Sequence, residues 1–386
     1  MPIGERAEQV AQLAAQIRQA VEALHPPGGA PPCKEAVRAR HAAQRAAVRA
    51  RTLPALLPRL PRLLGYFAEG WEVRPERIEP ELVPVDSRGE TGDLFRLATL
   101  LWSVPVSQGF GRRLRYLVLD RTNGRLIGLL GLGDPVFNLR ARDAWIGWDA
   151  ATRRERLVHV LDAFAVGAVP PYAGLLGGKL VVSLLGCREI GEEFERRYGA
   201  RPGVISGQRK GARLALVTVS SALGRSSLYN RVRLPGLVEL VRLGETEGWG
   251  HFHVGEELFA QMRGLLGLLG HPYASGHGYG QGPNWRMRVI RRALREVGLG
   301  GELLRHGIAR EVYALPRIPD APAFLRGEAP EAEECCPPAG EIAAAALARW
   351  VVPRAERRPE YRRWRREDTA RLLLGAEPCQ GLPHHV

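Results

Sequence analysis

The stretch from Leu114 to Leu185 places the strongest constraint on the fold of this chain. Two apolar runs flank Asn123-Gly124, a dipeptide that readily adopts the positive φ angles of a tight hairpin turn. A further apolar run, from Leu157 to Val169, leads into a glycine-rich bend, and the run from Leu180 to Leu185 follows that bend at once. This order predicts a β-hairpin, a strand, a bend and a helix, which together are typical of an α/β core.

The glycine-rich bend is the candidate cofactor-binding segment, and its candidate residues are Gly174, Gly177, Gly178 and Lys179. Backbone N–H groups at the start of a helix point outward, and together with the helix dipole they favour an anion. The spacing is neither that of a Walker A loop nor that of the dinucleotide fingerprint. The alternative is that the glycines only allow the helix to pack closely on the sheet.

The length of 386 residues suits two compact domains, or one large domain with appendages. An amphipathic helix is predicted over 5–24, and an Ala- and Arg-rich helix over 34–51, which Pro54, Pro58 and Pro61 end. A low-complexity linker is predicted from Pro316 to Gly340. One helix should then run from Glu341 through Arg371. We expect four segments: a helical N-terminal region with a Pro/Gly linker (1–92), an α/β core (93–254), a basic helical region (255–327), and a linker with a basic C-terminal helix (328–386).

The charge of the chain indicates a polyanionic partner. Lysine and arginine number 55 against 41 acidic residues, which gives a formal net charge of +14, and nearly all of the positive charge is arginine. A surface this basic attracts nucleic acid through counterion release, and DNA is the form that we expect.

Other classes of site and location receive less support from the sequence. The apolar runs are too short to cross a bilayer, and the amino terminus lacks the apolar core of a secretory signal, so we expect a cytoplasmic protein without a membrane partner. The five cysteines lack zinc-site spacing. His251 and His253 would share one side of a strand, which suits either a metal pair or a polar edge, but no third ligand is identifiable and we predict no metal.

Two basic segments are candidates for binding nucleic acid. The first follows an apolar strand, is dense in hydroxyl and guanidinium groups, and contributes Arg225, Ser226, Ser227, Asn230 and Arg231. Its alternative is a capped helix start at Ser220 or Ser221.

The second basic segment follows a glycine-rich loop, and Pro283 is placed for its first helical turn. It contributes Arg286, Arg288, Arg291, Arg292 and Arg295, the last four at three- and four-residue spacing on one helix face. Its alternative is a solvated surface. The segment from Arg354 to Arg366 has the same basic and aromatic character and suggests a mobile arm.

The hairpin, strand, glycine-rich turn and helix resemble the cofactor-binding part of the Gcn5-related acetyltransferases. The resemblance implies an acetyltransferase-like mixed sheet core with flanking helices and helical N- and C-terminal extensions, α/β (α+β) in class. It also implies an acyl-CoA site at Gly174 to Lys179. Gly174 stands where that family usually has Arg or Gln.

A second resemblance covers Leu94 to Gly327. The chain is similar there to the DruA proteins of Druantia anti-phage systems. The matching blocks, in order, are Gly109–Tyr116, Ile127–Val136, Arg142-Asp143, Ile146–Asp149, Gly167–Tyr172, Gly177–Leu180, Ser220–Arg231, Gly248–His253, Gly282–Arg286, Arg305–Gly307 and Phe324–Gly327. The resemblance implies an intracellular role in defence against phage beside a helicase-like Druantia partner. It brings no catalytic residues with it.

Two classes of function follow from these observations. The chain is either a defence component that binds nucleic acid, or an acyl-CoA-dependent transferase that modifies nucleic acid or protein. Glycine at position 174 favours the first class. The sequence identifies neither catalytic residues nor a definite cofactor.

Overall fold

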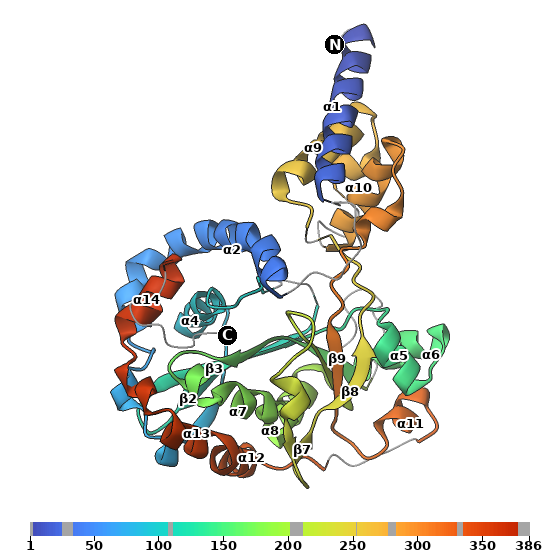
Figure 1. Cartoon of the computed structure of the whole chain (residues 1–386). Helices are drawn as coiled ribbons and strands as arrows, with labels where there is room; N and C mark the ends of the chain where they lie inside the picture. Colours follow the sequence, from blue (N-terminus) through green and yellow to red (C-terminus); the bar gives the residue numbers. More distant parts are fainter. Residues whose placement is uncertain are drawn as a thin grey trace. The chain divides into compact units, whose positions relative to one another are not determined.

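The computed structural model divides the chain into two compact units (Figure 1). Residues 1–44 and 246–310 form the smaller unit, and residues 45–245 and 311–386 form the larger one. In sequence, most of the smaller unit is therefore an insertion into the larger one. The structure describes residues 3–24, 34–106, 111–200, 211–251, 253–276, 283–329 and 335–376.

Within the described residues, a seven-stranded mixed sheet runs through the larger unit in the order β1-β2-β3-β4-β5-β9-β8 (Figure 1). β4 and β5 are parallel, and the other neighbouring strands are antiparallel. The mixed α/β class predicted from the sequence is confirmed. The strands are β1 (Pro80–Pro84), β2 (Arg113–Asp120), β3 (Arg125–Gly133), β4 (Val160–Ala168), β5 (Leu216–Ser220), β8 (Val241–Glu245) and β9 (Glu311–Pro316).

The predicted hairpin and the predicted bend are both present. Asn123-Gly124 lies in the turn between β2 and β3, where Gly124 has a φ of +69° and donates from its N–H to the carbonyl of Asp120 at 2.7 Å. After β4 the chain bends and enters α7 (Gly177–Ser183), which continues as the 3₁₀ turn η6 (Leu184–Gly186). The sheet reaches beyond the expected 93–254 segment on both sides, because it includes β1 and β9.

Helices cover both faces of this sheet. On one face Leu114, Tyr116 and Val118 of β2 pack in an apolar cluster with residues of α7, α8 (Arg188–Tyr198) and α12 (Ala339–Ala346). On the other face Leu117 of β2 packs with residues of α2 (Lys34–Leu56), α4 (Glu90–Thr99) and α14 (Arg366–Leu374). Near β5 and β9, a third cluster takes in α5 (Arg140–Ile146) and α11 (Ala321–Arg326).

Among the described residues, three amphipathic helices form the apolar core of the smaller unit. These are α1 (Ile3–Leu24), α9 (Glu256–Leu268) and α10 (Pro283–Glu296), and α9 packs against both of the others. Their apolar faces meet in a cluster that includes Ile17, Met262 and Ile290, all of which are fully buried. Burial of these apolar faces against one another stabilises the smaller unit.

Three expectations from the sequence are wrong in detail. The helix expected to end at Arg51 runs to Leu56, so that Pro54 lies inside α2 and the helix ends just before Pro58. The predicted linker contains α11, where Phe324 and Leu325 are buried. The C-terminal helix is broken: α12 passes through a π-helical stretch into α13 (Val352–Arg357), then a 3₁₀ turn η11 (Pro359–Arg363), and α14 follows.

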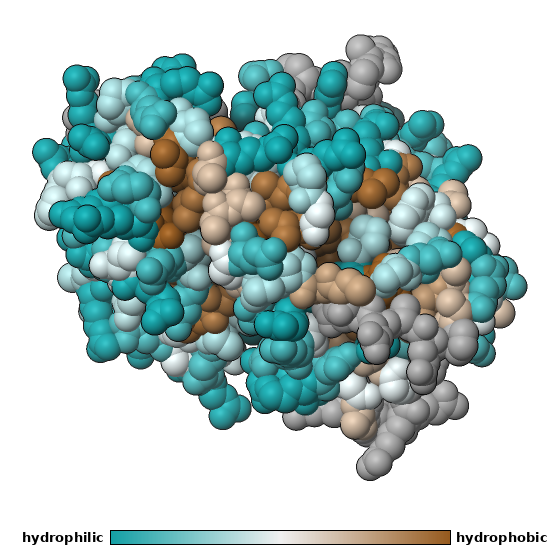
Figure 2. Space-filling model, turned by 90° about the horizontal axis from the view of Figure 1, so that it is seen from below, coloured by the Kyte–Doolittle hydropathy of each residue, from teal (hydrophilic) through white to brown (hydrophobic). Residues whose placement is uncertain are grey.

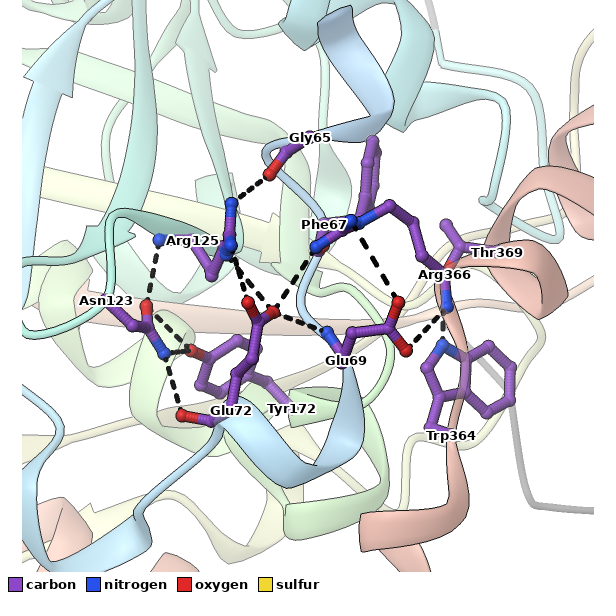
Figure 3. Close-up of polar contacts among 10 residues, drawn as sticks. All are labelled: Gly65, Phe67, Glu69, Glu72, Asn123, Arg125, Tyr172, Trp364, Arg366 and Thr369. Atoms are coloured by element: carbon purple, nitrogen blue, oxygen red, sulfur yellow. Dashed lines mark hydrogen bonds and ion pairs between the residues drawn. The ribbon is translucent and has the colours of Figure 1, made fainter. Parts of the chain in front are cut away.

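A polar network fastens the C-terminal segment to the hairpin end of the sheet (Figure 3). Glu72 accepts a hydrogen bond from Arg125 of β3, with Nη2 and Oε1 2.5 Å apart, and forms an ion pair with Arg366 at 3.4 Å. Arg366 also donates from Nε to the carbonyl of Phe67 at 2.9 Å. On the hairpin itself, Asn123 donates from Nδ2 to the hydroxyl of Tyr172 at 3.0 Å.

The same segment is held by close backbone packing. The N–H of Gly70 donates to the carbonyl of Trp364 at 2.8 Å, and a Cβ at Gly70 would lie 2.0 Å from the carbonyl oxygen of Tyr361. Tyr361 and Trp364 are buried. The aromatic residues of the suggested mobile arm are therefore part of the fold of the larger unit. Figure 2 shows one face of the molecule as mostly hydrophilic, with apolar atoms visible between polar side chains.

Candidate functional site

The backbone around the glycine-rich bend is tightly packed. The chain leaves β4, passes through a 3₁₀ turn (Tyr172–Leu175) and enters α7 at Gly177. A Cβ at Gly177 would lie 2.6 Å from the carbonyl oxygen of Tyr172, so a larger residue does not fit without a shift of the backbone. A Cβ at Gly178 would meet Leu228 at 3.5 Å, which is an ordinary contact. Gly177 thus has a packing role at the bend.

Lys179 and Gly174 both lie against the C-terminal segment. The ammonium group of Lys179 is buried and sits 5.2 Å from the ring centre of Trp350. Burial lowers its pKa, and the positive charges of nearby arginines, Arg231 first among them, lower the pKa further. Arg354 donates from Nε to the carbonyl of Gly174 at 3.3 Å.

A small cavity of about 30 Å³ lies beside Gly174, with Arg354, Tyr361 and Trp364 among its lining residues. One water molecule requires about 10–15 Å³ of cavity volume, so this cavity holds few waters. The acyl-CoA site stays a prediction.

The first basic segment is a short loop tied to strand β9. Ser226 accepts at its Oγ from the N–H groups of Leu228 (3.2 Å) and Tyr229 (2.9 Å), just before and at the start of the 3₁₀ turn η7 (Tyr229–Arg231). The hydroxyl of Ser221 donates to the carbonyl of Gly224. The side chains that this loop exposes are those of Arg225, Ser227, Asn230 and Arg231.

Glu311 is the buried anchor of this loop. Its carboxylate accepts from the N–H of Ser226 at 2.7 Å, from the hydroxyl of Tyr313 at 2.7 Å and from Nε of Arg242 at 3.0 Å. Burial alone would raise the pKa of the Glu311 carboxyl, but these hydrogen bonds hold it below the ordinary value of 4.5. Sequence reasoning missed this contact, because Ser226 and Glu311 are 85 positions apart.

The bend and the basic loop share one neighbourhood of the larger unit. Gly178 faces Leu228, and Arg231 lowers the pKa of Lys179 through its charge. The structure therefore brings together two predicted groups that lie about fifty residues apart in the sequence. Together they make this part of the larger unit rich in positive charge.

The second basic segment is α10 of the smaller unit, and its two faces differ sharply. Trp285, Val289, Ile290, Ala293 and Leu294 are buried against the other helices. The other face carries three exposed arginines, Arg288, Arg291 and Arg295. Arg292 is half-exposed there and forms an ion pair with Glu296.

Arg286 differs from the other arginines of α10 because it is tied into its own unit. Its guanidinium group forms an ion pair with Glu256 at 3.1 Å and donates to the carbonyl of Val254 at 2.7 Å. It also lies over the ring of Phe259, 4.1 Å from the ring centre. These contacts fix the start of α9 against α10. The structure places Arg286 apart from the exposed arginines with which the sequence grouped it.

The histidine pair lies in the smaller unit. Burial lowers the pKa of His251, and the charge of Arg286 lowers it further. The ring of His253 lies 6.0 Å from that of His306. In the part of the chain that the structure describes, three or more candidate metal ligands are nowhere grouped together.

One constellation that the sequence did not single out is a cavity of about 390 Å³ in the larger unit. It lies on the face of the sheet that α2 and α4 cover, and four arginines line it: Arg45, Arg96, Arg113 and Arg115. The alternation of β2 was the available signal, because Arg113 and Arg115 point to the face opposite Leu114 and Tyr116.

Comparison with known proteins assigns this chain to a family. The model of the family described as Druantia protein DruA matches residues 32–327. That range spans the sheet, the basic loop, the four-arginine cavity and α10. The chain belongs to the DruA family. It is thus an anti-phage protein of the Druantia type.

A DruA relative supports the same assignment over more of the chain. The Druantia protein DruA of Escherichia coli strain UMEA 4076-1 is 47% identical over 347 residues, which cover 90% of this chain and 85% of the relative. No solved structure matches the chain. Among the described helices, none combines the length and the apolar character that a membrane span requires.

Proposed function

We propose that this DruA-family chain acts in phage defence by binding nucleic acid, DNA above all, and that it works beside a helicase-like Druantia partner. The observation that carries the DNA-binding part is the division of α10 into a buried apolar face and an exposed arginine face. The partner part is supported by membership of the family, whose proteins belong to Druantia systems.

The arginine face of α10 suits contact with a phosphate backbone. Arg288, Arg291 and Arg295 lie at three- and four-residue spacing, so their guanidinium groups line one side of the helix. Neither Arg291 nor Arg295 forms an ion pair with any described residue. Guanidinium groups donate in a fork that matches phosphate oxygens, and such contacts carry little sequence information.

The exposed loop of the larger unit supports the same function independently. Arg225, Asn230 and Arg231 are exposed there, and Glu311 holds the loop in place. Positioned donors bind phosphate at a lower entropic cost than mobile ones. The net charge of +14 supplies the long-range attraction.

The test is a fluorescence anisotropy titration of labelled duplex and single-stranded DNA. Arg291→Ala with Arg295→Ala should weaken DNA binding by about tenfold or more across unrelated sequences. The control is Arg188→Ala with Arg196→Ala on α8, which removes the same charge from exposed arginines elsewhere. If the α10 variant and the control bind DNA equally well, the α10 face is only a solvated surface.

A further inference from the structure

The cavity of about 390 Å³ in the larger unit has the size of a small-molecule site, since such sites span about 300–1,000 Å³. Its walls come from α2, α4, the chain after α4, and strands β2 and β4. Elements far apart in the sequence thus converge on one space. The cavity lies within the larger unit and is separate from α10, so it raises a question that the DNA-binding proposal does not answer.

The cavity is strongly positive. Arg113 and Arg115 project from β2 on the same face of the sheet, two residues apart, and both are half-buried. Arg45 reaches the cavity from α2, and Arg96 from α4. Arg96 forms an ion pair with Asp93, but the other three arginines form no ion pair within the described residues.

Burial of these charges carries a cost that an anion would remove. The Nε atoms of Arg45 and Arg113 are buried and have no hydrogen-bond partner in the described part of the chain. Burial lowers the pKa of Arg113, and the like charge of Arg115 lowers it further. A bound phosphate supplies both the missing acceptors and the missing negative charge.

The neighbouring strand β3 leaves room for the side chains of Arg113 and Phe164. Arg113 pairs in register with Gly133 of β3, and Arg115 pairs with Gly131. A Cβ at Gly133 would lie 2.9 Å from Nη1 of Arg113, and one at Gly131 would lie 2.7 Å from the ring of Phe164. The two glycines therefore allow a guanidinium group and an aromatic ring to lie flat over the sheet.

Aromatic rings complete the wall. The guanidinium carbon of Arg113 lies 4.1 Å from the ring centre of Phe164, and that of Arg115 lies 5.8 Å from the ring centre of Phe95. Trp102 lines the cavity as well. Aromatic faces accept a nucleobase by stacking whatever the base is, while guanidinium groups bind its phosphates.

We propose that this cavity binds a nucleoside phosphate, with its phosphate on Arg45, Arg113 and Arg115 and its base against the aromatic wall. Two sources share that chemistry: a free nucleotide, and the 5′-phosphorylated end of a nucleic-acid strand. A simple sugar would leave the charge of the arginines unmatched.

The experiment is a calorimetric titration of the full chain with ATP, with AMP, and with a short single strand that carries either a 5′-phosphate or a 5′-hydroxyl. Saturable binding of ATP or AMP would identify the free nucleotide as the source. Binding of the phosphorylated strand in clear preference to the hydroxyl strand, without nucleotide binding, would identify the strand end. Either result supports the site. The proposal would be overturned if neither nucleotide bound saturably and the phosphorylated and hydroxyl strands bound alike.

Variants test whether the nucleoside phosphate binds in this cavity. Arg115→Gln should reduce affinity about tenfold or more, and Arg115→Lys should recover part of it because the charge returns. Arg45→Gln, on a half-exposed helix position that tolerates glutamine, should reduce affinity without loss of fold. Arg154→Gln, an exposed arginine on α6 (Ala150–Arg156), is the control.

The α10 variant separates the two proposals. Arg291→Ala with Arg295→Ala should leave the binding of ATP and AMP unchanged, and likewise any preference for the 5′-phosphorylated strand over the hydroxyl strand, because those arginines belong to the other unit. If folded Arg45→Gln and Arg115→Gln bind the probes as the parent does, the cavity is not the site, whatever the outcome of the DNA titration.

Discussion

Replacing Glu311 with alanine should destabilise the larger unit substantially. The change leaves two buried donors without their acceptor: the N–H of Ser226 and the hydroxyl of Tyr313, each now 2.7 Å from the carboxylate. An unsatisfied buried donor costs about 1–3 kcal/mol, so the two together predict a loss of about 2–6 kcal/mol in the free energy of unfolding. Arg242 is half-exposed, and its guanidinium group can return to water at little cost.

The free energy of unfolding can be measured by urea denaturation followed by circular dichroism. Glu245→Ala is the matched control, because Glu245 is an exposed carboxylate that pairs with the same Arg242 at 2.8 Å. Such an exposed pair contributes about 0–1 kcal/mol. A loss of less than about 1 kcal/mol in Glu311→Ala, comparable to the control, would refute the assignment of Glu311 as the anchor of the loop.

The same carboxylate makes the stability depend on pH. The pKa of Glu311 is lower in the folded chain than its ordinary value of 4.5, so its ionised form stabilises the fold above that value. This contribution is lost as the pH falls through the folded pKa. The stability difference between the parent and Glu311→Gln should therefore be constant near neutral pH and shrink below about pH 4.5.

Two further substitutions test the packing described above. Gly177→Ala should destabilise the larger unit by about 1–3 kcal/mol, because its Cβ would lie 2.6 Å from a backbone oxygen, whereas Gly178→Ala should stay within about 0.5 kcal/mol of the parent; urea denaturation measures both. Arg286→Ala should lower the melting temperature of the chain more than Arg291→Ala does, because only Arg286 bonds to Glu256 and to a buried carbonyl; equal melting temperatures would contradict that role.

Local signals in the sequence predicted the elements that depend on neighbouring residues. Asn123-Gly124 indicated the hairpin because the turn needs a positive φ angle, which Gly124 alone supplies, and the apolar period of α10 indicated its buried face. α11 carried signals that the Pro-rich composition obscured: Asp320 caps its start and Gly327 ends it in the left-handed conformation. Capping residues, rather than composition, would have located this helix.

Features that depend on contacts between residues far apart in the sequence could not be predicted. β1 begins and ends with proline and has no clear alternation, yet it pairs with β2 along its whole length. The anchoring of Ser226 by Glu311 and the four-arginine cavity both require knowing which strands are neighbours. Tertiary pairing decides these features, and a single sequence does not display it.

The salt dependence of DNA affinity tests the central claim most directly. The claim is that the exposed arginines of α10 contact phosphates, and each such contact on duplex DNA contributes about −0.9 to the slope of log affinity against log salt concentration. The parent should show a steep negative slope, and Arg291→Ala with Arg295→Ala should flatten it by about two, while Arg188→Ala with Arg196→Ala keeps the parent's slope. Identical slopes in all three proteins would contradict the account.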